Sequence, residues 1–210
     1  MTAKPSRIEK KEQLKSELLQ FIHNHGGILK TADLNAFSVN YRQLQKLLEE
    51  NFLKRVKNGY YTLGESGMTE EQLVAALYSD AVLCMDSALY YYHYIEEKPA
   101  VWHLAVDKNT SKARFKAEFP KVKPYYTESH VLESGVVPIL VGGSEMKIYQ
   151  KERLICDCVR YESHLEPKVL RQALSSYIKD EKKDIRSLNR FARERNVSNK
   201  VHNMIGVWLG

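Results

Sequence analysis

Polar and basic side chains that can bind nucleic acid cluster at one point of the chain. Asn40, Tyr41, Arg42, Gln43 and Lys46 follow one another closely in a segment of helical periodicity. Arg and Gln are the residue types that form bidentate hydrogen bonds with the edges of guanine and adenine in the major groove of DNA. We therefore expect these residues to contact DNA bases from the N-terminal end of a helix.

A second group of cations follows in a predicted hairpin. Lys54, Arg55 and Lys57 precede Asn58-Gly59, a pair typical of a tight turn in which both residues accept positive φ. Cations at the tip of such a hairpin suit contact with phosphate, which fixes register and raises affinity without reading sequence. Thr31 and Asn58 complete the predicted DNA-binding set.

The elements that would position these side chains follow from the spacing of the apolar residues. That spacing predicts an amphipathic helix over residues 8–25, ended by Gly26-Gly27. Thr31 is placed to cap a short second helix, and residues 40–51 form a third. Three helices followed by a two-stranded hairpin are the outline of a winged helix-turn-helix, whose third helix lies in the major groove. The alternative is a module of the same outline that contacts only protein.

The rest of the chain predicts a second domain. Gly64-Glu-Ser-Gly67 is the expected linker, so we divide the chain into residues 1–66 and 67–210. Strand-like runs predict a small antiparallel sheet, in which Pro124 and Pro138 occupy edge strands or bulges because proline cannot donate to a ladder. Asp86 is placed to cap a helix after the first short strand, and a helical bundle follows from about residue 151. The predicted fold class is α+β.

Two groups of charged residues in this second domain are candidates for a functional surface. In one predicted helix, Arg153, Asp157 and Arg160 are four and three residues apart and share a face, as a ladder of ion pairs or as an interaction surface. In a later helix, the same spacing aligns Arg186, Arg190 and Arg193 into a basic stripe. The stripe would contact phosphate, face RNA or simply be solvated.

Composition bounds the remaining possibilities. The net charge of +6 divides into +4 over residues 1–67, −3 over 68–149 and +5 over 150–210, so the chain is basic at both ends. Three cysteines do not make a disulfide framework, and Cys156-x-Cys158 would point to nearly opposite faces of a helix, which disfavours a metal site. No carboxylate, His or Cys set has catalytic spacing, so we expect no metal, no cofactor and no enzymatic activity. No apolar run approaches the ~20 residues of a membrane span, and the polar N-terminus lacks a signal peptide, so we expect a cytoplasmic protein.

Several segments together resemble the AbiEi-type antitoxins of bacterial type IV toxin–antitoxin systems, which act in abortive infection. Residues 27–34 (Gly-Ile-Leu-Lys-Thr-Ala-Asp-Leu), Leu44 with Leu47 and Leu48, and the hairpin of residues 52–63 resemble the family's N-terminal domain. Residues 86–93 (Asp-Ser-Ala-Leu-Tyr-Tyr-Tyr-His) and 148–160 resemble two later segments. Leu154 stands where the family usually has Thr, which counts against hydroxyl chemistry there. The match runs in order over nearly the whole chain.

The resemblance implies a two-domain antitoxin that acts as an autorepressor. Its winged helix would bind inverted repeats in the promoter of its own operon, and its C-terminal domain would counteract a nucleotidyltransferase-like toxin without forming a stable complex with it. Two other functions stay open: a winged-helix transcriptional regulator whose C-terminal domain dimerises or senses a ligand, and an enzyme acting on nucleic acid or nucleotides.

Overall fold

A computed structural model describes residues 6–64, 68–116 and 119–206. The chain is mixed α+β and separates into two compact units. The first unit comprises residues 1–78 with 116–120 and 141–144, and the second comprises 79–115, 121–140 and 145–210. Of the expected linker, residues 65–67 lie outside the described part of the chain.

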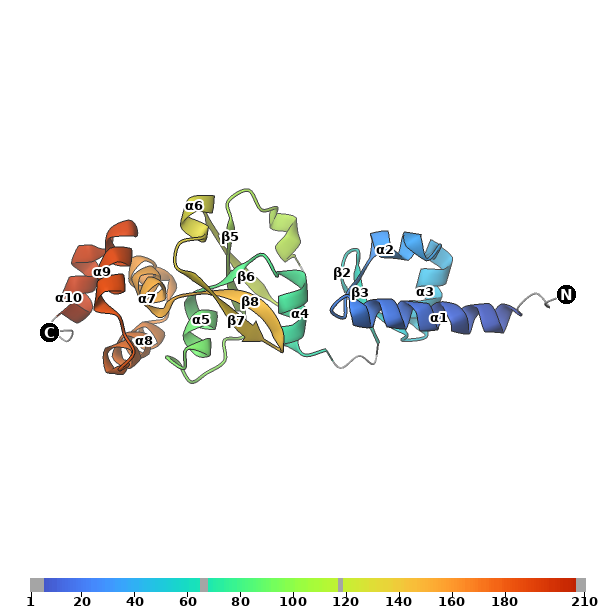
Figure 1. Cartoon of the computed structure of the whole chain (residues 1–210), viewed down its shortest axis with the longest axis horizontal. Helices are drawn as coiled ribbons and strands as arrows, with labels where there is room; N and C mark the ends of the chain where they lie inside the picture. Colours follow the sequence, from blue (N-terminus) through green and yellow to red (C-terminus); the bar gives the residue numbers. More distant parts are fainter. Residues whose placement is uncertain (1–5, 65–67, 117–118, 207–210) are drawn as a thin grey trace. The chain divides into compact units, whose positions relative to one another are not determined.

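The first unit begins with three helices and a small sheet (Figure 1). Its elements are α1 (Arg7–Asn24), β1 (Leu29–Lys30), α2 (Thr31–Ala36), α3 (Tyr41–Glu49), β2 (Leu53–Lys57), β3 (Tyr60–Leu63) and α4 (Glu70–Leu77). The three strands pair antiparallel in the order β1-β3-β2. Leu18 and Ile22 of α1, Leu44 and Leu47 of α3, and Leu53 of β2 lie in one buried core. The predicted apolar face of each helix therefore faces its neighbours.

The helix starts in this unit depend on side chains that hydrogen-bond to backbone N–H groups. Asn40 caps α3, as its residue type favours. The prediction that Thr31 caps α2 is wrong, because Thr31 is the first helical residue and Lys30 occupies the cap position. The Asp33 carboxylate accepts the Lys30 N–H at 2.7 Å, so an acid in the first turn takes the place of a capping hydroxyl.

The hairpin between β2 and β3 turns at Asn58-Gly59 as predicted, but with a different backbone. Gly59 has a φ of 78°, whereas Asn58 is not among the residues with positive φ. The register shifts between Arg55 and Lys57, which is a bulge in β2. A bulge adds twist to the strand, so the chain reverses with only one left-handed residue.

The second unit contains a five-stranded sheet and most of the remaining helices. Its elements are β4 (Val82–Leu83), α5 (Met85–Tyr91), β5 (Trp102–Asp107), η1 (Lys112–Phe115), β6 (Val122–Thr127), α6 (Ser129–Leu132), β7 (Val136–Val141), β8 (Ser144–Tyr149), α7 (Lys151–Arg160), η2 (Glu162–His164), α8 (Pro167–Lys179), α9 (Ile185–Glu194) and α10 (Ser198–Ile205). The prediction that Asp86 caps a helix is wrong, because Asp86 lies within the first turn of α5. The helix begins at Met85, and Cys84 occupies the cap position.

The sheet is mixed, so the expectation of an antiparallel sheet is wrong. The strand order is β6-β5-β4-β8-β7, in which β4 is parallel to β8 and β5 is parallel to β6. Residues 108–121 connect β5 to β6, and a connection of about a dozen residues allows the chain to return and start in the same direction. Pro124 and Pro138 lie in β6 and β7, the two edge strands, which confirms that part of the prediction.

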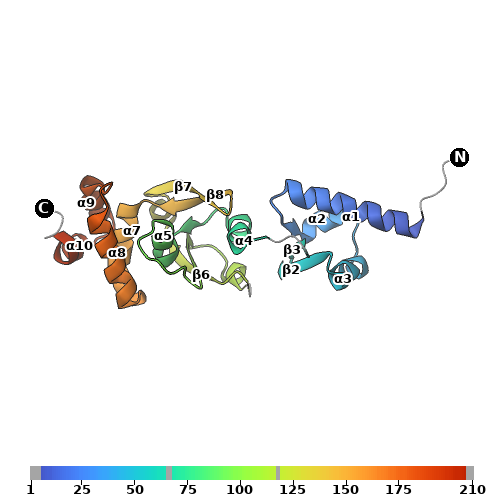
Figure 2. The same ribbon diagram turned by 90° about the horizontal axis from the view of Figure 1, so that it is seen from below.

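Helix α7 lies next to the sheet, with α8, α9 and α10 packed beyond it (Figures 1 and 2). Every residue of α7 from Glu152 to Val159 is buried, including its charged ones. Asp184 caps α9 by accepting the N–H groups of Arg186 and Ser187. The predicted helical bundle is therefore arranged around one buried helix.

Candidate nucleic-acid interface

The outward face of α3 carries polar and basic side chains. Tyr41 is 74% exposed, and Arg42, Gln43 and Lys46 are also exposed. Leu44 and Leu47 occupy the opposite face and are buried, which fixes the rotation of the helix about its axis. The structure therefore presents the predicted base-contacting residues on one accessible face.

Asn40 and Gln43 are partly committed to holding the end of α3. The Asn40 Oδ1 atom accepts the Gln43 N–H at 3.0 Å, and the Gln43 Oε1 atom accepts the Asn40 N–H at 2.9 Å. This reciprocal capping box uses the side-chain carbonyl of both residues. The Gln43 amide keeps its NH₂ donors for an acceptor on a base, whereas the primary role of Asn40 is structural.

The charge at the far end of α3 is compensated from α1. The Glu50 carboxylate forms two ion pairs, with the Lys11 Nζ atom 2.5 Å from Oε1 and the Lys15 Nζ atom 3.1 Å from Oε2. The hydrogen bond from Lys11, followed by that from Lys15, lowers the pKa of Glu50, so this carboxylate stays ionised and paired. The positive charges of Arg42 and Lys46 are consequently not offset by this acid.

The hairpin presents its cations in two different environments. Lys54 and Arg55 are exposed, with the Arg55 guanidinium 5.7 Å from the centre of the Tyr61 ring. Lys57 is half-buried, because its ammonium group lies 4.3 Å from the centre of the Tyr60 ring. Lys54 and Arg55 are thus the more accessible phosphate contacts, and Lys57 also stabilises the hairpin through a cation–π contact.

Thr31 lies beside the hairpin turn although it is far from it in sequence. Its N–H donates to the Gly59 carbonyl at 2.9 Å, which ties the start of α2 to the turn. A Cβ atom on Gly59 would lie 3.4 Å from the Thr31 Oγ1 atom, an ordinary van der Waals contact, so glycine is favoured here by its φ of 78° and not by lack of space. Thr31 and Asn58 are both exposed, and the structure brings them to one edge of the first unit.

Two of the residues predicted as an interaction surface of the second unit are buried. Arg153 is 1% exposed and Asp157 is 4% exposed, so the prediction of an accessible surface is wrong for this pair. Their predicted ion pair is confirmed, with Arg153 Nε 2.9 Å from Asp157 Oδ2. The Nη1 group of Arg153 donates to the carbonyls of Val131 and Ser134 at 3.2 and 3.0 Å.

Arg160 does not pair with Asp157, because Arg195 at the C-terminal end of α9 binds the second oxygen of that carboxylate. Arg195 donates to Asp157 Oδ1 at 2.6 Å, and Arg160 donates instead to the Arg195 carbonyl at 2.5 Å. The sequence prediction missed Arg195, which is the C-cap residue of α9 in the structure. Spacing within a single helix could not reveal a partner that comes from another helix.

Arg186, Arg190 and Arg193 are exposed on α9, as the stripe predicted. The three cysteines are buried free thiols, and burial raises the pKa of Cys156 to about 12. Within residues 6–64, 68–116 and 119–206, no group of three or more His, Cys, Asp or Glu side chains is arranged to hold a metal ion.

A comparison with models of known protein families finds no match, and a search of curated proteins finds no significant relative. In the part of the chain that the structure describes, no helix combines the length and apolar character required to cross a bilayer.

Proposed function

We propose that the first unit is a winged helix-turn-helix that binds double-stranded DNA. The order α1-β1-α2-α3-β2-β3, with a β1-β3-β2 sheet, supports this proposal because it places a helix pair before a two-stranded wing. The observation that carries it is the exposed N-terminal face of α3, where Tyr41, Arg42 and Gln43 are all accessible.

In the proposed complex, α3 enters the major groove. Arg42 donates to the N7 and O6 atoms of guanine, and the Gln43 amide donates to a base acceptor. Lys54 and Arg55 contact phosphates from the wing, which adds affinity that depends on salt and not on sequence. Thr31 and Asn58, which lie at the hairpin turn, add polar contacts to the sugar-phosphate backbone of the DNA.

We further propose that the protein is the antitoxin of a type IV toxin–antitoxin pair and represses its own operon. The support is the resemblance of the ordered segments to AbiEi-type antitoxins, combined with the DNA-binding features of the first unit. In this proposal the second unit counteracts a nucleotidyltransferase-like toxin without forming a stable complex with it, and the protein performs no catalysis.

An electrophoretic mobility shift with the full chain tests the DNA-binding proposal. The probe is the duplex directly upstream of the protein's own coding sequence, and a shuffled duplex of equal length and composition is the control. We expect a specific complex and a footprint over an inverted repeat. Equal affinity for both duplexes at every salt concentration would contradict the proposal and favour a module that contacts only protein.

Co-expression with the neighbouring reading frame tests the antitoxin proposal separately. We expect a nucleotidyltransferase-like neighbour to arrest growth alone and to be neutralised when this chain is present. A chain that binds its upstream DNA but fails to rescue growth would instead be a transcriptional regulator. Turnover of nucleotides or nucleic acid by the purified chain would favour an enzyme.

A further inference from the structure

Helix α9 exposes a row of three guanidinium groups. Arg186, Arg190 and Arg193 follow at intervals of four and three residues and are exposed, while Leu188 and Phe191 of the same helix are buried. The Arg190 guanidinium lies 4.4 Å from the centre of the Phe191 ring. At 1.5 Å of rise per residue the row spans about 10 Å. It is therefore a continuous basic stripe on one face of the helix.

The stripe is not neutralised by the acids around it. None of its three guanidinium groups forms an ion pair within the described residues. Asp184 caps α9 and also accepts from the Ser187 hydroxyl at 2.6 Å, while Glu162 pairs with Lys200 at 2.6 Å and Glu194 accepts from Ser134 at 2.8 Å. Asp184 lies close enough to Arg186 for their charges to attract, but none of these carboxylates forms an ion pair with a guanidinium group of the stripe, so the three arginines keep a net positive charge for anions.

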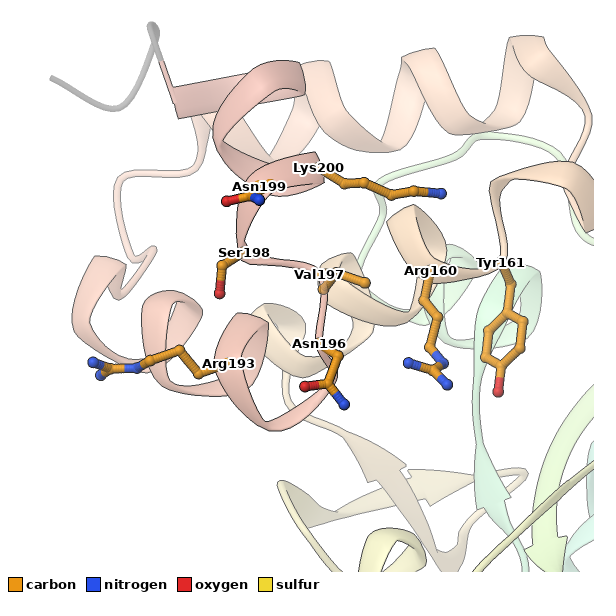
Figure 3. A pocket seen from close by; sticks show the side chains of 8 residues that line it. All are labelled: Arg160, Tyr161, Arg193, Asn196, Val197, Ser198, Asn199 and Lys200. Carbon is orange, nitrogen blue, oxygen red and sulfur yellow. The ribbon is translucent and has the colours of Figure 1, made fainter.

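A groove continues from the end of the stripe. It has a volume of about 720 Å³ and lies where the ends of α7 and α9 meet the start of α10. Figure 3 shows Arg160 and Tyr161 side by side at one end of the group, with Arg193 at the other. The groove is lined by Arg160, Tyr161, Arg193, Asn196, Asn199 and Lys200.

The groove combines the groups that recognise an unpaired nucleotide. Arg160 is held in place by its 2.5 Å bond to the Arg195 carbonyl and remains exposed. Asn196 and Asn199 are exposed amides that both donate and accept hydrogen bonds, as a base edge requires. Tyr161 adds a half-buried aromatic ring, the residue type on which bases of single strands stack.

We propose that the α9 stripe and this groove bind a single-stranded nucleic acid, with the arginines on successive phosphates and an unpaired base in the groove. This site is separate from the proposed DNA interface of α3 and the wing. A positively charged track next to an aromatic side chain and amide groups is typical of single-strand binding, whereas a base within a duplex could not enter the groove.

Fluorescence anisotropy of the full chain tests this proposal. The probes are a labelled oligo-U RNA and an oligo-dT DNA of about 12 nucleotides, together with a duplex of the same length. We expect both single strands to bind more tightly than the duplex, and the two arms show whether RNA or DNA is preferred. We expect the variant R186Q/R190Q/R193Q to bind single strands about tenfold or more weakly than the unchanged chain. The slope of log K against log salt concentration should become shallower by about 2.

The matched control removes three exposed cations elsewhere in the second unit. The variant K112Q/K121Q/R171Q has the same net charge, and we expect it to bind single strands like the unchanged chain. Equal losses in the two variants, or no loss in the α9 variant, would overturn the proposal. Thermal melting of both variants establishes that each is folded.

The upstream duplex separates this inference from the proposed DNA-binding function. We expect the α9 variant to retain its shift of that duplex, and R42A to retain single-strand binding while binding the duplex more weakly. If the α9 variant lost the duplex and the single strand in parallel, the stripe would belong to the same interface as α3. That result would overturn a separate site and leave the DNA-binding proposal intact.

Discussion

Arg195 donates to Asp157, with its Nε atom 2.6 Å from the Oδ1 atom of a carboxylate that is 4% exposed. The bond joins the end of α9 to the middle of α7. Arg153 occupies the other carboxylate oxygen and extends to the carbonyls of Val131 and Ser134. One carboxylate therefore holds two guanidinium groups, and through them three separate segments of the second unit.

Substitution of this carboxylate should destabilise the second unit strongly. In Asp157→Asn, two buried guanidinium groups lose their counter-ion, and breaking a buried ion pair from one side costs about 3–5 kcal/mol. The free energy of unfolding from urea titration, followed by a probe of the second unit, measures the effect.

The control for this prediction is an exposed ion pair of the same chemistry. Arg114 pairs with Asp80, whose side chain is 63% exposed. Because solvent screens such pairs, Asp80→Asn should cost at most about 1 kcal/mol. Equal costs at the two positions would mean that the carboxylate of Asp157 does not organise its surroundings.

Acidification should weaken the second unit through His103. Burial, with a smaller contribution from Lys123, lowers the pKa of His103 from 6.5 to about 4. Between about pH 4 and pH 6.5, the imidazole of His103 therefore binds a proton in the unfolded chain but not in the folded chain. Stability is fully present above about pH 6.5 and falls as the pH decreases towards 4, by on the order of 2 kcal/mol.

Urea titrations at several pH values, with His103→Gln as the comparison, measure this contribution. The neighbouring Asp86 acts in the opposite sense, because burial raises the pKa of its carboxyl and the folded state then favours the protonated form. The difference in the pH dependence of stability between the unchanged protein and His103→Gln gives the contribution of the His103 imidazole. A pH dependence that is the same in both would show that His103 is not the responsible group.

Local chemistry was enough to predict several features of the fold. The spacing of apolar residues predicted the helices α1 and α3, and Asn58-Gly59 predicted the turn between β2 and β3, because each pattern acts over a few neighbouring residues. Pro124 and Pro138 lie in edge strands, where a missing N–H is tolerated because one side of the strand has no ladder partner. These features depend on neighbours in sequence or on a missing donor, which a sequence displays directly.

The features that could not be predicted depend on contacts between distant segments. Spacing placed Arg153 and Asp157 on one helical face, but not whether solvent or another helix covers that face. The parallel pairing of β4 with β8 likewise joins Val82 to Lys147, two residues with no local relationship. The partner of Asp157 at Arg195 also comes from another helix, so periodicity within α7 assigned its second ion pair wrongly.

The exposed arginine of α3 should contribute both affinity and sequence preference. Because its guanidinium would bind a guanine edge, Arg42→Ala should weaken binding to the upstream duplex by roughly 1–3 kcal/mol and relax selectivity at one base pair. Mobility-shift titrations against a set of single-base variants measure both effects. Arg7→Ala, which removes an exposed arginine from the start of α1, is the control and should bind normally. Unchanged affinity in Arg42→Ala would remove this residue from the interface.

The wing should contribute affinity without selectivity. Lys54 and Arg55 are exposed, and the double variant K54A/R55A leaves the packing of Lys57 on Tyr60 in place. The loss of two phosphate contacts should weaken binding to every duplex alike and reduce the slope of log K against log salt by about 2. The control R7A/K10A removes two exposed cations from α1 and should leave that slope unchanged. A loss confined to one operator sequence would instead assign Lys54 and Arg55 to base contacts, because phosphates are common to all sequences.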